Sequence, residues 1–220
     1  MEIPFLQENK NVGLLLLISG LITILGGILL VALRINYHVS GWYLYVAIIA
    51  MIIAIISGLL YILAGLSVRD SKDDQFGLFP KLAAIVSLKI EYDIKVGVPA
   101  FIFLVMGVTM ILSGIVSIFA LDVFGILIGF ILGIFYVLSA PMVAGQNKPD
   151  YAKIFWLVLV ILTLVFGIIL ALVGAILSIG AGVWGIAGVL SGIVTFIIAL
   201  YLLLALLSDD IKNNMGADYF

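Results

Sequence analysis

Asp, Glu, Lys, Arg and His residues, which carry most acid–base and metal chemistry in proteins, lie outside the long apolar stretches of this sequence. The only histidine, His38, follows Arg34 in a short polar turn, and one imidazole cannot supply the two or more protein ligands of a transition-metal site. Carboxylates cluster in two polar segments, as Asp70, Asp73 and Asp74 and as Asp209 and Asp210. Acid–base catalysis needs such groups to face one another across a cleft, so a solvated position explains them better.

The sequence offers no other recognisable reactive group. It has no cysteine, which excludes disulfides, thiolate metal sites and thiol nucleophiles. It contains no phosphate-binding loop, nucleophile elbow or zinc-protease helix. Charged groups at membrane depth are costly and mark ion pathways or ligand sites, and no Asp, Glu, Lys, Arg or His lies inside the apolar stretches. We therefore expect a protein that is not an enzyme and that carries neither a metal nor another cofactor.

Composition assigns the chain to the integral membrane proteins. Of the 220 residues, 65% are hydrophobic and 10% are charged, whereas a soluble domain carries about 25% charged residues. The net charge of −2 is too small to favour a nucleic-acid partner. We expect membrane lipid to surround most of the chain.

Six apolar stretches are each long enough to cross a bilayer. A helix rises ~1.5 Å per residue, so about 20 residues span the ~30 Å hydrocarbon core. The stretches are 12–33, 41–66, 98–120, 123–144, 154–178 and 184–207. Short turns join them in pairs, which predicts an all-α bundle of six transmembrane helices in a single membrane domain, 1–220. Its three hairpins cover 12–66, 98–144 and 154–207, and a hydrophilic loop covers 67–97.

The distribution of basic residues predicts the orientation. All ten Lys and Arg residues except Arg34 fall at one end of the predicted spans, the end that also holds both termini. The positive-inside rule then places the N- and C-termini and the long loops in the cytoplasm of a multi-pass cell-membrane protein. Aromatic residues at the predicted boundaries fit interfacial anchors, with Trp42, Tyr43, Tyr45 and Trp184 outside and Tyr151 and Trp156 inside.

Glycines form an internal repeat in the first helix of each predicted hairpin. They recur at seven-residue spacing, as Gly13, Gly20 and Gly27, as Gly107 and Gly114, and as Gly167 and Gly174. The fourth stretch adds Gly125, Gly129 and Gly133 at GxxxG spacing. Small residues let the backbones of membrane helices approach closely, so we expect helix packing at these strips. They pack either inside this bundle or, above all for the fourth stretch, against a partner subunit.

A second repeat places a tyrosine in the second helix of each hairpin, as Tyr61, Tyr136 and Tyr201. Each lies near the predicted cytoplasmic end of its span, at a depth of ~8–12 Å. A phenol in hydrocarbon needs a hydrogen-bond partner. The three either reach toward the membrane interface or form a shared polar layer, for which the candidate partners are Ser57, Ser139 and Thr195.

The segment 87–96 alternates apolar and charged residues. Leu88, Ile90, Tyr92 and Ile94 interleave with Lys89, Glu91, Asp93 and Lys95. A period of two is typical of a half-buried strand, although a lone strand is not stable by itself. The segment is either an extended linker resting on the membrane surface or a strand that adds to the sheet of a partner or to the same segment of a second copy.

The three glycine-patterned hairpins, in a chain of this length, resemble the small six-span prokaryotic membrane proteins of the HdeD acid-resistance family. The resemblance covers all six predicted spans and rests on the repeat pattern and the length. In that family a proline often follows the first helix of a hairpin, whereas none follows Leu33, Phe119 or Ser178 here. The resemblance implies the six-span fold and assigns no catalytic residue.

Two functions remain open at the level of sequence. The first is a non-enzymatic accessory or structural subunit that packs against other membrane proteins or a second copy of itself, which the glycine strips favour. The second is a small carrier or channel for a neutral or apolar solute, since internal repeats are common in transporters. A membrane-embedded enzyme is the least favoured, because no set of residues carries the chemistry.

The predicted topology can be tested with single cysteines, which the chain otherwise lacks. Ser71→Cys, Asn147→Cys and Asn213→Cys should resist a membrane-impermeant thiol reagent added to intact cells, whereas Ser40→Cys and Asp122→Cys should react. The reason is the one-sided distribution of basic residues. Labelling of Asn147→Cys from outside would overturn the six-span arrangement.

Overall fold

The computed structural model describes residues 8–36, 41–70, 95–145, 150–180 and 183–216. Within these ranges the chain forms seven α-helices, which are α2 (Asn9–Asn36), α3 (Trp42–Asp70), α5 (Gly97–Ala120), α6 (Val123–Val143), α7 (Ala152–Gly180), α8 (Val183–Leu206) and α9 (Asp209–Met215). Each predicted apolar stretch is a helix whose ends lie within a few residues of the prediction. In an apolar environment the helix satisfies the backbone N–H and C=O groups internally, which explains this agreement.

Several of these helices have the length and composition of membrane spans. Among the described residues, α2, α3, α5 and α6 are four helices long and apolar enough to cross a membrane. A fifth crossing is added if Gly192–Leu206 and Asp209–Met215, which meet at a bend of 73°, count as one span. The all-helical fold is thus confirmed, whereas the six crossings, the repeat and the cytoplasmic termini stay predictions.

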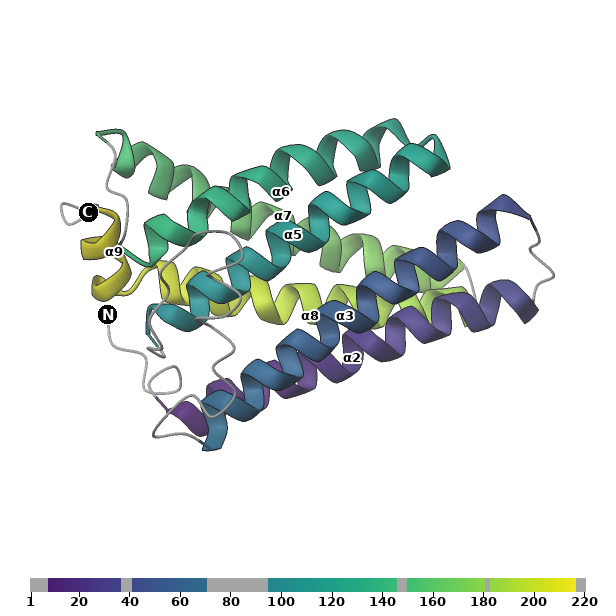
Figure 1. Ribbon diagram of the computed structural model, residues 1–220, viewed down its shortest axis with the longest axis horizontal. Helices are drawn as coiled ribbons and strands as arrows, with labels where there is room; N and C mark the ends of the chain where they lie inside the picture. Colours follow the sequence, from purple (N-terminus) through teal and green to yellow (C-terminus); the bar gives the residue numbers. More distant parts are fainter. Residues whose placement is uncertain (1–7, 37–40, 71–94, 146–149, 181–182, 217–220) are drawn as a thin grey trace.

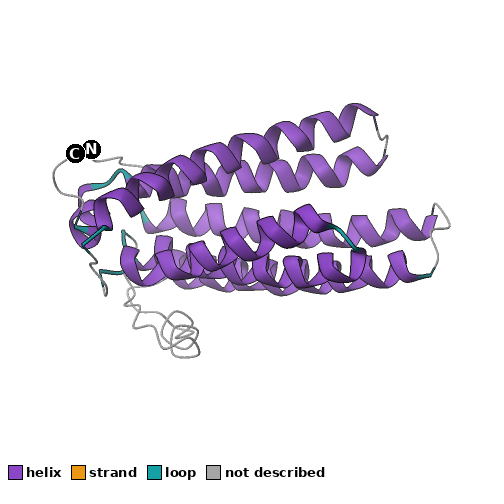
Figure 2. Cartoon of the chain, turned by 90° about the horizontal axis from the view of Figure 1, so that it is seen from above, coloured by secondary structure: helices purple, strands orange, loops and turns teal. Residues whose placement is uncertain are grey.

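The six long helices are arranged as three antiparallel hairpins, α2–α3, α5–α6 and α7–α8, whose axes run along the length of the molecule (Figures 1 and 2). The first hairpin joins the other two, because α2 packs against α8 and α3 packs against α5. Helix α9 contacts α6, α7 and α8 at one end of the bundle. We call this end, where α2, α5 and α7 begin, the α9 end (Figure 1).

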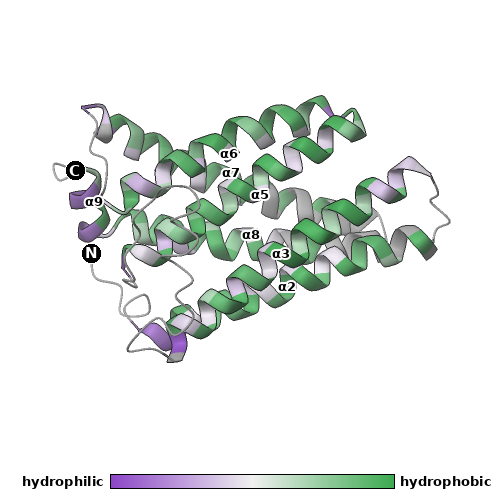
Figure 3. Ribbon diagram, in the orientation of Figure 1, coloured by the Kyte–Doolittle hydropathy of each residue, from purple (hydrophilic) through white to green (hydrophobic). Residues whose placement is uncertain are grey.

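Among the residues whose burial the structure describes, the apolar core lies in the half of the bundle at the α9 end. Among the described residues, the largest fully buried side chains are Val12, Leu16, Phe101, Ile102, Phe103, Tyr136, Leu159, Leu202, Leu206, Ile211 and Met215. Residues 97–105 of α5 are all buried, so the start of this helix runs through the centre of the core. Farther along α5, Val108, Leu112 and Ile115 are exposed. Hydrophilic residues gather at the α9 end, on α9 itself and near the start of α2 (Figure 3).

The turn between α5 and α6 is as short as the sequence predicts. Leu121 adopts the left-handed conformation with φ of 56°, and its N–H donates to the carbonyl of Ile118 at 3.2 Å. Asp122 then caps α6, because its carboxylate accepts a hydrogen bond from the N–H of Gly125 at 3.0 Å. This cap satisfies an N–H group that has no partner within the helix. The tight turn holds α5 and α6 side by side.

The predicted glycine strip of α2 lies against α3. The facing pairs are Gly13 with Gly65, Gly20 with Gly58 and Gly27 with Ala54. A Cβ atom built on Gly20 would lie only 2.5 Å from the carbonyl oxygen of Gly58. The two backbones therefore touch, which larger side chains would prevent.

The glycines of the second and third hairpins also face the paired helix of the same hairpin. The facing pairs are Gly107 with Gly133, Gly114 with Gly129, Ser117 with Gly125 and Gly167 with Ala199. The surroundings of Gly174 lie outside the described part of the chain. The interpretation that the glycine strip of α6 seats a partner subunit is wrong at Gly129 and Gly133, because α5 of the same chain already covers them.

Substitution of one packed and one open glycine of α2 tests this contact. Gly20→Leu should destabilise the bundle by about 1–3 kcal/mol, because the added side chain forces α2 and α3 apart. Gly26→Leu is the matched control on the same helix, since a Cβ atom there would meet nothing within 4 Å. Thermal unfolding in a mild detergent measures both. Equal destabilisation by the two substitutions would contradict a packing role for the strip.

Candidate functional site

The three tyrosines of the predicted polar layer are enclosed by protein. Tyr61 of α3, Tyr136 of α6 and Tyr201 of α8 have exposed fractions of 4%, 0% and 3%. All three belong to the core at the α9 end. The surroundings of Tyr136 include a second polar side chain, that of Thr163.

Tyr136 lies in an aromatic cluster between the second and third hairpins. Its ring centroid is 5.6 Å from that of Phe103 and 6.3 Å from that of Phe135, and Phe135 stacks on Phe155 of α7 at 4.7 Å. Its phenol lies beside the hydroxyl of Thr163 on α7. Neither hydroxyl makes a hydrogen bond of ordinary geometry to a described residue. A buried hydroxyl without such a bond costs about 1–3 kcal/mol, so we take this pair as the candidate polar site of the core.

Two of the three hydroxyls that the sequence suggested as partners of the tyrosines are bonded within their own helices. Ser57 donates to the carbonyl of Ile53 at 2.7 Å, and Ser139 donates to the carbonyl of Phe135 at 2.7 Å. Both bonds lie within one helix, so these two protons do not link helices. Thr163 is not among the predicted partners, although it is the one hydroxyl residue in 154–177. Thr163 lies beside Tyr136 only because α7 packs against α6 in the tertiary structure.

A short C-terminal helix, which the sequence analysis did not predict, closes the end of the bundle. Helix α9 follows α8 after a bend of 73°. Asp209 and Asp210 in its first turn favour a helix N-terminus, and Gly216 ends it in the left-handed conformation with φ of 72°. Ile211 and Met215, four residues apart on one face, are 0% and 1% exposed. This pattern of cap residues and apolar spacing is a signal from which the helix can be predicted.

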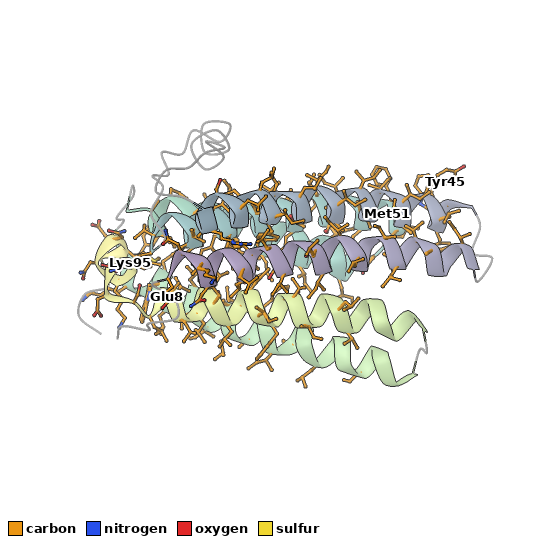
Figure 4. The ribbon with its side chains drawn as sticks, turned by 90° about the horizontal axis from the view of Figure 1, so that it is seen from below. Glu8, Tyr45, Met51 and Lys95 are labelled. Carbon is orange, nitrogen blue, oxygen red and sulfur yellow. The ribbon has the colours of Figure 1, made fainter. Side chains whose placement is uncertain are left out.

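Polar contacts connect α9 to the surrounding helices. Lys95, just before α5, lies against α9 and forms an ion pair with Asp210 at 3.3 Å (Figure 4). The ammonium group of Lys212 lies 5.3 Å from the ring centroid of Trp156 on α7. The indole N–H of Trp156 in turn donates to the carbonyl of Leu206 at 2.9 Å, which satisfies a carbonyl at the end of α8. Together these contacts tie the start of α5 and α7 to the end of α8.

Two of the predicted aromatic anchors make contacts inside the protein. Trp156 is 5% exposed and its N–H is bonded to the chain, so its prediction as an interfacial anchor is wrong. Trp42 is exposed, but it donates to the carbonyl of Phe119 at 2.6 Å and thereby joins the first and second hairpins at the end opposite α9. Tyr43 and Tyr45 are 61% and 64% exposed at that end, where Figure 4 shows Tyr45.

The predicted partner strand lies outside the described residues. This applies to its four apolar positions, Leu88, Ile90, Tyr92 and Ile94. Of the segment 87–96, the structure describes Lys95 and Val96. Strand addition to a partner therefore stays a prediction.

Comparison with protein-family models, with curated proteins and with solved structures finds no match to this chain. The resemblance to the HdeD family therefore stays a prediction from the repeat pattern. Any functional conclusion has to come from the residues and contacts described above.

The relative importance of apolar and ionic contacts in the α9 cap can be measured. Ile211→Ala should lower the free energy of unfolding by about 2–5 kcal/mol, because the side chain is fully buried. Asp210→Ala should cost at most about 1 kcal/mol, because the side chains of the ion pair are 45% and 51% exposed. Unfolding in a mild detergent compares the two variants. A larger loss from Asp210→Ala would mean that charge, not apolar burial, holds the cap.

Proposed function

We propose that this protein is a non-enzymatic accessory or structural subunit of a membrane assembly. In this proposal the chain crosses the cell membrane six times, has both termini in the cytoplasm, and packs against other membrane proteins or a second copy of itself. The proposal assigns no catalytic residue, metal or cofactor to the chain.

The observation that carries this proposal is the filled core at the α9 end of the bundle. Residues 97–105 of α5 are buried on all sides, and Phe101, Ile102 and Phe103 have no exposed surface. A packed apolar core across the α9 end of the bundle supports a structural role better than a conducting one. The predicted spans also contain no Asp, Glu, Lys, Arg or His, whereas ion pathways and proton relays commonly use these residues.

The position of the basic residues supports the proposed orientation. Lys10, Arg69, Lys95, Lys153 and Lys212 all belong to helix ends or turns at the α9 end. Under the positive-inside rule this end faces the cytoplasm. The opposite end carries the exposed aromatic residues at the start of α3, which suit a membrane–water boundary.

The outward side of α6 is the surface that we propose for contact with a partner. The glycine strip of this helix is used within its own hairpin, so a partner would meet the large side chains on the other side. Phe124, Ile131 and Leu138 recur at seven-residue spacing there and are 77%, 64% and 56% exposed. Such a row lies along one side of a helix and presents a continuous apolar ridge.

A second candidate is a small carrier for a neutral solute. The buried hydroxyls of Ser19, Tyr136 and Thr163, none with a hydrogen bond of ordinary geometry to the described chain, favour it. Hydroxyl groups inside an apolar core are able to bind a small neutral molecule without any charged residue.

Purification and reconstitution discriminate between the two candidates. In a mild detergent, the accessory role predicts a particle heavier than the 23.7 kDa chain, with a fixed stoichiometry measured by light scattering. Ile131→Asp should shift the particle toward the monomer, because a charge disrupts an apolar contact. Ile102→Val, which keeps the core apolar, is the control and should leave the particle intact. A monomer that takes up a solute into liposomes would refute the accessory role and support the carrier.

A further inference from the structure

Tyr136 and Thr163 place two hydroxyl groups side by side in the apolar core. Tyr136 belongs to α6 and Thr163 to α7, so the pair lies across the contact between the second and third hairpins. Their exposed fractions are 0% and 1%. Within the described chain neither hydroxyl has a hydrogen bond of ordinary geometry. Buried polar groups in proteins nearly always have a hydrogen-bond partner, so we expect one for each of these two hydroxyls.

Thr163 differs from three other hydroxyl residues in the helices. Thr23, Ser57 and Ser139 each donate to the carbonyl four residues earlier, at 2.8, 2.7 and 2.7 Å. This bond is the usual way in which serine or threonine satisfies its proton inside a helix. Thr163 does not make it, although Leu159 supplies the equivalent carbonyl. Its hydroxyl lies instead beside the phenol of Tyr136.

A direct bond between the two hydroxyls satisfies only one of their protons. Each hydroxyl carries one proton and two lone pairs. Whichever group donates, the accepting hydroxyl keeps its own proton without an acceptor. The neighbouring rings of Phe103 and Phe135 carry no oxygen or nitrogen. A third group that accepts two hydrogen bonds completes the site, and water is the smallest such group.

We propose that one water molecule is bound between Tyr136 and Thr163 and accepts a hydrogen bond from each hydroxyl. The two lone pairs of water match the two protons, and backbone carbonyls retain a second lone pair for the protons of the water itself. The bound water forms a polar link between α6 and α7, next to the stack of Phe135 on Phe155. The inference does not depend on the proposed function.

Hydroxyl-radical footprinting with a short X-ray pulse tests this site in the full chain in detergent micelles. The pulse converts a bound water into a hydroxyl radical at its binding site. Because this radical forms next to Tyr136, Tyr136 should be oxidised although its side chain is completely buried. Phe101, which is also 0% exposed, is the internal control and should stay unmodified. An unmodified Tyr136 in the folded protein overturns the proposal.

Three variants identify the group that holds the water. Thr163→Val should reduce oxidation of Tyr136 to the background of Phe101, and Thr163→Ser should restore it. Ser139→Ala is the matched control, because Ser139 is equally buried and is bonded within its own helix. It should leave oxidation of Tyr136 unchanged. Unchanged oxidation in Thr163→Val overturns the proposal. Oxidation of Phe101 in Thr163→Val would show that this variant is unfolded. In that case, the oxidation of Tyr136 in the parent protein and in Thr163→Ser tests the proposal.

Discussion

The close approach of helix backbones at glycine is the contact on which the rest of the structure depends. In lipid, apolar faces gain little by leaving their surroundings, so helices associate through close packing and through hydrogen bonds between them. Gly20 against Gly58 and Gly107 against Gly133 bring the backbone of one helix directly onto the carbonyl of the next. This pairing builds each hairpin as a unit. The three units are then joined by contacts of a different kind.

Large side chains, rather than glycines, join the three hairpins at the α9 end. The first turns of α5 pass through the centre of the core, where Phe101 and Phe103 are fully buried. Helix α9 covers this end and buries Ile211 and Met215 beneath it. At the opposite end, Trp42 bonds to the last turn of α5. The outward faces of α5 and α6 remain exposed and apolar, which suits a surface covered by lipid or by a partner protein.

The buried hydroxyl groups of the described core are of two kinds. Helices satisfy the backbone, and residues such as Ser57 satisfy their hydroxyls within their own helix. The hydroxyls of Tyr136 and Thr163 are different, because they meet between two hairpins. The buried hydroxyl groups in the described core support the proposed assembly role, or the proposed binding of a small neutral molecule.

The sequence by itself determined the helices, because an apolar stretch of membrane length has to satisfy its backbone internally whatever surrounds it. It also determined where small residues allow close approach. Only the tertiary structure decided that the α6 glycines face α5 and that Trp156 is buried. It likewise decided that Thr163 is the hydroxyl beside Tyr136. These outcomes depend on which faces of different hairpins meet. Periodicity within one helix identifies a face but carries no information about the helix that covers it.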